Sequence, residues 1–114
     1  MNFLINNEEN ITTVKVDETR LDASVAPDFK QKMEDIINEG NDQIILDISK
    51  ITFMDSSSLG AMVAVLKAMG SHGKLVIQGA SGVVLELFKL TRMDRVFTLK
   101  EDAESALEVF AEAV

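Results

Sequence analysis

The 114-residue chain contains no cysteine, no tryptophan and no tyrosine. Without cysteine it can form neither a disulfide framework nor a thiolate metal site. Basic residues are also scarce, because 11 lysines and arginines stand against 19 aspartates and glutamates, which gives a formal net charge of -8. Since nucleic acids are bound through clusters of lysine and arginine, this balance argues against binding to DNA or RNA.

Long apolar runs and targeting signals are missing as well. No basic and then apolar leader opens the chain, so we expect no signal peptide. The apolar stretches are far shorter than the roughly 18 residues that a membrane helix needs. Hydrophobic residues nevertheless make up 46% of the chain, which is enough for the core of one domain over residues 1–114. We therefore expect a single-domain cytoplasmic protein that makes no contact with a membrane.

The apolar pattern alternates between short runs and helical spacing. Five runs are typical of strands, over residues 3–7, 11–16, 43–48, 74–78 and 95–99. Helical spacing predicts four helices, which begin near Val25, after Asp55, at residue 82 and at Glu101. The order β-β-α-β-α-β-α-β-α predicts an α/β fold with a mixed five-stranded sheet. Four strands would be parallel and in sequential order, and the N-terminal strand would add an antiparallel edge.

The same pattern identifies the expected core. Strand and helix positions that face inward in this phase are Ile44, Leu46, Ile48, Val63, Leu66, Val76 and Phe88. The last helix is expected to bury Leu107, Phe110 and Val114, and to carry Glu101 and Asp102 in its first turn, where the helix dipole favours acidic groups.

The loops that follow the strands are expected to gather at one edge of the sheet, over residues 17–24, 49–57, 79–82 and 99–101. In α/β sheets the edge at the carboxyl ends of the strands is the usual place for function. The motif MDSSSLG, from Met54 to Gly60, lies in this group. Residues 51–100 carry six basic and three acidic groups, so this part of the chain has a charge of +3 and is the part most tolerant of an added anion.

Three consecutive serines, Ser56, Ser57 and Ser58, follow Asp55 at the start of a predicted helix. All four residues are good N-cap types, and a cap needs only one of them. A helix N-terminus also provides free amides and a partial positive charge that suit a phosphate. Two interpretations are therefore open: the serines cap the helix, or one of them is a site at which a phosphate is added and removed.

Catalysis by this edge has little support in the sequence. His72 is the only histidine, and the predicted helix between it and the serines would separate them by about 21 Å, too far for a Ser-His relay. No nucleophile elbow, phosphate-binding loop or metal-ligand cluster is present, so we expect no enzyme activity, metal or cofactor. Apolar residues around the serines, namely Phe53, Met54, Leu59 and Met62, suggest instead that a partner protein docks there.

Three segments together resemble the STAS domain family, in particular its anti-sigma-factor antagonists. The segment ILDISKITFMDSSSLGAMVAVLKAM (45–69) is similar to the family signature, in which a strand is followed by Asp-Ser-Ser-Gly-Leu-Gly and an apolar helix. TRLDASVAPDFKQKM (19–33) and VVLELFKLTRMDRVF (83–97) resemble two further family segments. Two residues depart from the pattern, because Ser58 and Arg92 stand where the family has glycine. The resemblance implies a right-handed βα superhelix on one mixed sheet.

The resemblance also implies a partner-switching function. Members of this class bind a serine-kinase anti-sigma factor, which phosphorylates the serine directly after the aspartate, and a metal-dependent serine phosphatase removes the phosphate. By position this serine is Ser56, with Ser57 and Ser58 as alternatives. The implied partner surface consists of Asp22, Met54, Asp55, Ser56, Ser57, Ser58, Leu59 and Met62. Alone, the protein is expected to be a monomer.

Two other functions remain open at this stage. Some STAS domains are adaptor subunits of transport, sensory or biofilm-type assemblies and have no phosphoryl switch or sigma-factor control. A small hydrolytic enzyme that uses Asp55 and Ser56 is the second alternative, although the sequence supplies no base for it.

Overall fold

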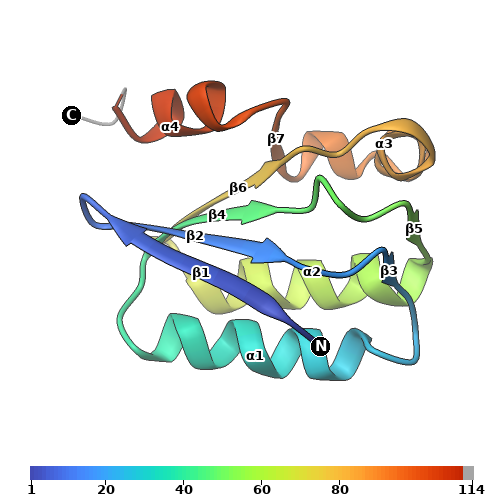
Figure 1. The fold of residues 1–114 in the computed structure, drawn as a ribbon, viewed down its shortest axis with the longest axis horizontal. Helices are drawn as coiled ribbons and strands as arrows, with labels where there is room; N and C mark the ends of the chain where they lie inside the picture. Colours follow the sequence, from blue (N-terminus) through green and yellow to red (C-terminus); the bar gives the residue numbers. More distant parts are fainter. Residues whose placement is uncertain (112–114) are drawn as a thin grey trace.

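A computed structural model of the chain, which describes residues 1–111, shows one mixed sheet with helices on both faces (Figure 1). The sheet has the strand order β1-β2-β4-β6-β7, and a separate two-stranded sheet joins β3 to β5. The strands are β1 (Phe3–Glu8), β2 (Ile11–Val16), β3 (Arg20–Leu21), β4 (Gln43–Asp47), β5 (Phe53–Met54), β6 (Lys74–Gln78) and β7 (Thr98–Lys100). The helices are α1 (Ala26–Asn38), α2 (Ser56–Met69), α3 (Gly82–Leu90), the 3-10 helix η1 (Met93–Arg95) and α4 (Ala103–Ala111).

The predicted topology is confirmed. β1 pairs with β2 in antiparallel fashion, and β2, β4, β6 and β7 then follow as parallel neighbours. Each parallel connection passes through a helix, as parallel strands require. The short parallel pair of β3 and β5 was not predicted, because two-residue strands leave no periodic signal in the sequence.

The core lies mainly between the sheet and the helices α1 and α2, which pack against each other on one face (Figure 1). The side chains of the predicted core residues Ile44, Leu46, Ile48, Val76 and Phe88 are buried. A smaller cluster on the opposite face joins the sheet to α4 through Ile45, Val76, Ala106, Val109 and Phe110. No helix within residues 1–111 is long and apolar enough to cross a membrane.

The prediction that Val63 and Leu66 are core residues is wrong. Both are only partly buried, because the buried face of α2 is rotated toward Ser58, Met62, Val65 and Met69. An almost wholly apolar helix has a weak periodic signal, so its phase could not be read accurately from the sequence.

The C-terminal segment also differs from the prediction in detail. The last strand begins at Thr98 rather than at residue 95, because Met93–Arg95 forms η1 and Phe97 packs edge-to-face on Phe88 with ring centroids 5.9 Å apart.

The last helix, α4, begins at Ala103, so Glu101 and Asp102 precede it, and Asp102 Oδ1 accepts a hydrogen bond of 2.9 Å from the Ser105 amide. Phe110 is buried as expected, whereas Leu107 is 46% exposed. The prediction for Val114 lies outside the described residues.

A pair of alanine substitutions tests the corrected phase of α2. Met62 is fully buried, so Met62→Ala should lower the free energy of unfolding by about 2–5 kcal/mol. Leu66→Ala should cost less than Met62→Ala, because part of the Leu66 side chain is already in contact with water. Urea denaturation of both variants measures the loss in free energy of unfolding. A larger loss for Leu66→Ala would support the phase expected from the sequence, in which Leu66 faces the core.

Arg92 offers a second test, because it adopts a left-handed backbone conformation with φ 61° and ψ 20°. This conformation costs a residue with a side chain about 1–2 kcal/mol, whereas glycine adopts it freely but loses more entropy on folding. Arg92→Gly should therefore raise the free energy of unfolding by about 0.5–1 kcal/mol. Arg95→Gly is the matched control, since φ of Arg95 is not positive, and it should give no gain. Equal effects of the two substitutions in thermal denaturation would contradict this explanation.

Candidate functional site

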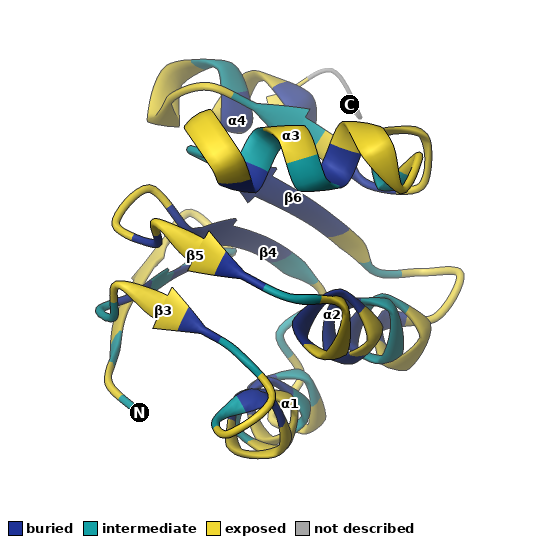
Figure 2. Ribbon diagram, turned by 90° about the vertical axis from the view of Figure 1, so that its right-hand side faces the viewer, coloured by how far each residue is buried: buried dark blue, intermediate teal, exposed yellow. Residues whose placement is uncertain are grey.

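The loops predicted to share an edge do meet there. β3 and β5 lie side by side with Leu21 opposite Met54, which brings the segment after β3 next to the start of α2 (Figure 2). The Thr19 carbonyl accepts hydrogen bonds from the Thr52 amide at 2.8 Å and from the Thr52 hydroxyl at 3.2 Å. Gly79 joins the same edge, because its amide donates to the Lys100 carbonyl at 2.9 Å.

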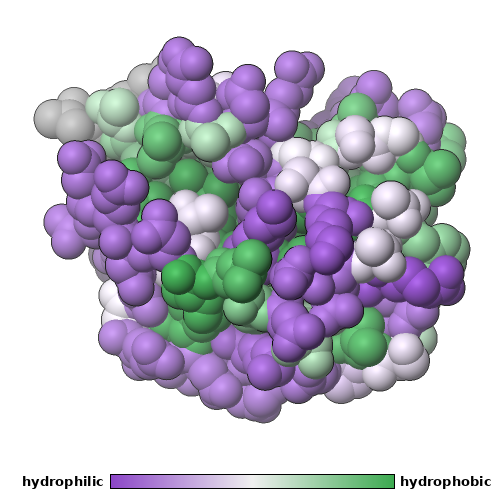
Figure 3. Space-filling view, viewed as in Figure 1, coloured by the Kyte–Doolittle hydropathy of each residue, from purple (hydrophilic) through white to green (hydrophobic). Residues whose placement is uncertain are grey.

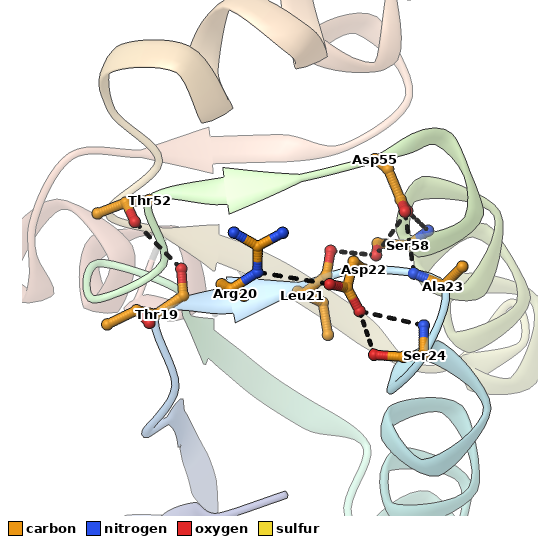
Figure 4. A network of polar contacts seen from close by, with 9 residues as sticks. All are labelled: Thr19, Arg20, Leu21, Asp22, Ala23, Ser24, Thr52, Asp55 and Ser58. Carbon is orange, nitrogen blue, oxygen red and sulfur yellow. Dashed lines mark hydrogen bonds and ion pairs between the residues drawn. The ribbon is translucent and has the colours of Figure 1, made fainter.

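Asp55 is the N-cap of α2 and also holds the neighbouring loop. Its Oδ1 accepts a hydrogen bond of 3.0 Å from the Ser58 amide, and its Oδ2 accepts one of 2.9 Å from the Ala23 amide (Figure 4). Partial burial raises the pKa of the Asp55 carboxyl, but the amides of Ser58 and Ala23 and the Ser58 hydroxyl outweigh this, so the net effect is a lowered pKa. One carboxylate thus joins the start of α2 to the segment between β3 and α1.

Ser58 has a structural role. Its side chain is fully buried, its hydroxyl donates to the Leu21 carbonyl, and the same oxygen lies 3.1 Å from Asp55 Oδ1. The residue that departs from the family glycine therefore adds a second tie between α2 and β3. Because this hydroxyl is buried, it is not accessible to a kinase in this fold, and Ser58 is removed as an alternative phosphorylation site.

Ser56 and Ser57 are both exposed, at the first two positions of α2. Within residues 1–111 their hydroxyls have no hydrogen-bond partner, unlike that of Ser58. Ser57 also borders a shallow groove between α1 and α2, which Ala23, Ala26 and Lys30 line from the other side. The surplus of hydroxyls is thus divided: Asp55 caps the helix, Ser58 ties it to β3, and Ser56 and Ser57 face solvent.

Asp22 lies beside this site in a small polar cluster. It accepts hydrogen bonds from the Ser24 hydroxyl at 2.5 Å and from the Ser24 amide at 3.0 Å, and its Oδ2 is 3.5 Å from Arg20 Nε. These donors, the Ser24 hydroxyl above all, lower the pKa of Asp22. The Arg20 guanidinium in turn stacks 4.5 Å from the centroid of the Phe53 ring, which is 38% exposed. Phe53 belongs to the apolar residues expected around the serines, whereas Arg20 was missed in the sequence because it lies on the two-residue strand β3.

Three apolar residues expected at the partner surface lie instead in the core. Met54 and Leu59 are each 5% exposed and Met62 is fully buried, so a partner cannot reach them in this fold. His72 is exposed in the turn that follows the far end of α2, as predicted, and is therefore separated from the serines by the length of that helix. No group of three or more potential metal ligands occurs within residues 1–111.

Comparisons with known proteins agree on one family. The sequence model of the STAS domain matches residues 2–106. The anti-sigma-B factor antagonist of Staphylococcus aureus (strain NCTC 8325 / PS 47) is 27% identical over 105 residues, which cover 91% of this chain and 96% of that protein.

Two solved structures share the fold. An anti-sigma factor antagonist from Mycobacterium paratuberculosis has a TM-score of 0.86 at 19% identity, over 95% of this chain and 92% of that chain. The Bacillus cell fate determinant SpoIIAA in its phosphorylated form has a TM-score of 0.70 at 17% identity, over 96% of this chain and 99% of that chain.

Asp55→Asn tests whether the carboxylate holds the edge together. The side chain of asparagine has only one acceptor oxygen, so it cannot replace both carboxylate oxygens, and the backbone amide of Ala23 would lose its acceptor. At neutral pH the free energy of unfolding should therefore fall by about 1–2 kcal/mol. The pKa of Asp55 is lowered in the folded state, so its contribution is complete above the pKa of the unfolded chain and is lost as the pH falls through the folded value. The difference in free energy of unfolding between the unmodified protein and Asp55→Asn should therefore be smaller in acid than at neutral pH. If this difference in free energy of unfolding were equal in acid and at neutral pH, the charge of Asp55 would have no stabilising role.

Proposed function

The chain belongs to the STAS domain family, and from this premise we propose that it is an anti-sigma-factor antagonist that acts by partner switching. The partner is a serine-kinase anti-sigma factor, which binds the unmodified protein and phosphorylates Ser56. A metal-dependent serine phosphatase reverses the modification. In this role the protein has no catalytic activity of its own and acts in the cytoplasm.

One observation carries the proposal: Ser56, directly after the capping aspartate, is exposed, although Asp55 before it and Ser58 two positions after it are fixed in hydrogen bonds. The names of similar proteins support the same function, since the Staphylococcus aureus relative is called an anti-sigma-B factor antagonist. The phosphorylated form of SpoIIAA further supports a phosphoryl switch on this fold.

The proposed contact surface is smaller than the sequence suggested. It consists of the exposed or half-exposed residues at the edge, namely Asp22, Asp55, Ser56 and Ser57. Arg20 and Phe53 extend this surface, and arginine and aromatic side chains often contribute strongly to protein interfaces.

Phosphorylation of Ser56 would change this surface by charge and volume. The phosphate adds about -1.5 to -2 charges at neutral pH, close to the carboxylates of Asp22 and Asp55. Free amides at the start of α2 offset part of that charge within the domain. A partner that covers Ser56 would have to bury the remainder, which is costly unless it supplies a cation. A loss of about 3 kcal/mol at the interface weakens binding by more than a hundredfold, enough to exchange partners.

The helix itself should tolerate the modification. The cap bond from the Ser58 amide goes to Asp55, not to Ser56, so the phosphate replaces no hydrogen bond of the fold. Binding should therefore be lost while the domain stays folded.

Phosphosite mapping tests the proposal directly. The protein, Ser56→Ala and Ser57→Ala are each incubated with ATP and a purified serine-kinase anti-sigma factor from the source bacterium, followed by mass spectrometry and a binding titration. We expect phosphate on Ser56 in the protein and in Ser57→Ala, with binding weakened by more than about a hundredfold after phosphorylation. Ser56→Ala should bind but stay unmodified.

Three results would contradict the proposal in different ways. Phosphate on Ser57 with none on Ser56 would show that the position was carried over wrongly from the family pattern. Equal affinity of the phosphorylated and unmodified proteins would refute the switch, and a lack of any phosphorylation would favour an adaptor subunit.

A further inference from the structure

The outer edge of β1 is unprotected. β1 is the last strand on its side of the sheet, and no strand within residues 1–111 pairs with its outer edge. Leu4 is 55% exposed and Ile5 is 52% exposed, and an apolar patch is visible over β1 in the space-filling view (Figure 3). Residues 3–7 include no charged residue and no proline, the features that usually prevent an edge strand from pairing with another chain.

The backbone of β1 has a fixed hydrogen-bonding phase. The hairpin turn is Glu9-Asn10, with φ of 52° and 67°, so Glu8 and Ile11 form the first pair beside a two-residue loop. At the other end the Asn2 carbonyl accepts a bond of 2.9 Å from the Asp17 amide. Even-numbered residues of β1 therefore bond to β2, and the amides and carbonyls of Phe3, Ile5 and Asn7 point outward.

From this phase we infer that a second copy of this chain pairs with β1 in antiparallel fashion, with the two-fold axis at Ile5. Hydrogen bonds between the two copies can form only between the outward-pointing backbone amides and carbonyls of Phe3, Ile5 and Asn7. The register that pairs most of these groups places Ile5 opposite Ile5 and Phe3 opposite Asn7 of the second copy. Leu4 then lies opposite Asn6 of the second copy. The two five-stranded sheets become one continuous sheet, and the exposed Ile5 side chains pack against each other.

Charge along the strand does not oppose this register, although each copy has a net charge of -8. Glu8 faces Asn2 of the second copy, so no like charges are opposed along the strand. Ile5 also borders a groove next to α1 that is lined by Lys32, Asp35 and Ile36. This groove carries one basic and one acidic side chain, Lys32 and Asp35, so it adds no net charge next to the strand contact.

This dimer uses a surface separate from the switch, because β1 contributes no residue to the site around Asp55 and Ser56. The contact is confined to one strand and its flanking groove, which places it among small interfaces that associate weakly. It differs from the monomer expected from the sequence, because the sequence pattern identifies the edge strand but not the exposure of its Leu4 and Ile5 side chains.

Single cysteine variants test the register cleanly, since the chain has no cysteine of its own. Across a hydrogen-bonded pair the Cα atoms are about 5.5 Å apart, within disulfide range, so Ile5→Cys should form a covalent dimer under mild oxidation with diamide. Leu4→Cys alone should not, because the two copies of residue 4 are diagonal neighbours about 7–8 Å apart. A mixture of Leu4→Cys and Asn6→Cys should form the mixed dimer. Ser71→Cys, in an exposed turn, gives the rate of random collision, which Ile5→Cys should exceed by about tenfold or more.

Sedimentation equilibrium of the unmodified chain completes the test. The dimer fraction should rise with protein concentration, and Ile5→Lys should lower it strongly while the melting temperature stays the same, because residue 5 is half exposed. Three results would overturn the inference: a monomer at the highest soluble concentration, cross-linking of Ile5→Cys no faster than that of Ser71→Cys, or equal cross-linking of Leu4→Cys and Ile5→Cys.

Discussion

The carboxylate of Asp55 is the interaction on which the functional edge depends. It accepts a hydrogen bond from one backbone amide in the first turn of α2 and from another in the segment between β3 and α1, where Ala23 lies 32 residues before Asp55 in the sequence. The hydrogen bonds to charged oxygen that it makes are stronger than neutral ones, and its lowered pKa keeps it ionised at neutral pH. A buried neighbour, Ser58, reinforces the same junction through the Leu21 carbonyl.

Asp55 and Ser58 provide the hydrogen bonds that fix the start of α2, and within residues 1–111 no hydrogen bond of the fold uses the hydroxyls of Ser56 and Ser57. In the proposed function, this separation explains why the chain places three serines at the start of an apolar helix. A modification at Ser56 changes the charge of the surface without removing a bond that the helix needs. In the proposed switch, a stable fold and a labile interface are thus controlled by different residues of one short motif.

Much of the fold could be predicted from the sequence, because its signals are local and periodic. The continuous apolar run of β4 and the hairpin at the N-terminus gave the right strands and the right order. The phase of α2 was not readable, because a helix that is apolar on most sides has no distinct polar face. For the same reason Leu59 and Met62 looked available to a partner, although both are core residues. Arg20, Phe53 and the Ala23 amide join the site through the short β3–β5 pairing, a long-range contact that no local pattern indicates.

The most direct test of this account follows the amides bonded to Asp55 when Ser56 is phosphorylated. Hydrogen exchange measured by NMR would report the protection of the Ser58 and Ala23 amides in the unmodified and the phosphorylated protein. We predict equal protection of both amides in the two forms, together with loss of binding to the anti-sigma factor. Loss of protection at both amides on phosphorylation would contradict it, because the switch would then act by unfolding the start of α2 rather than by changing its surface.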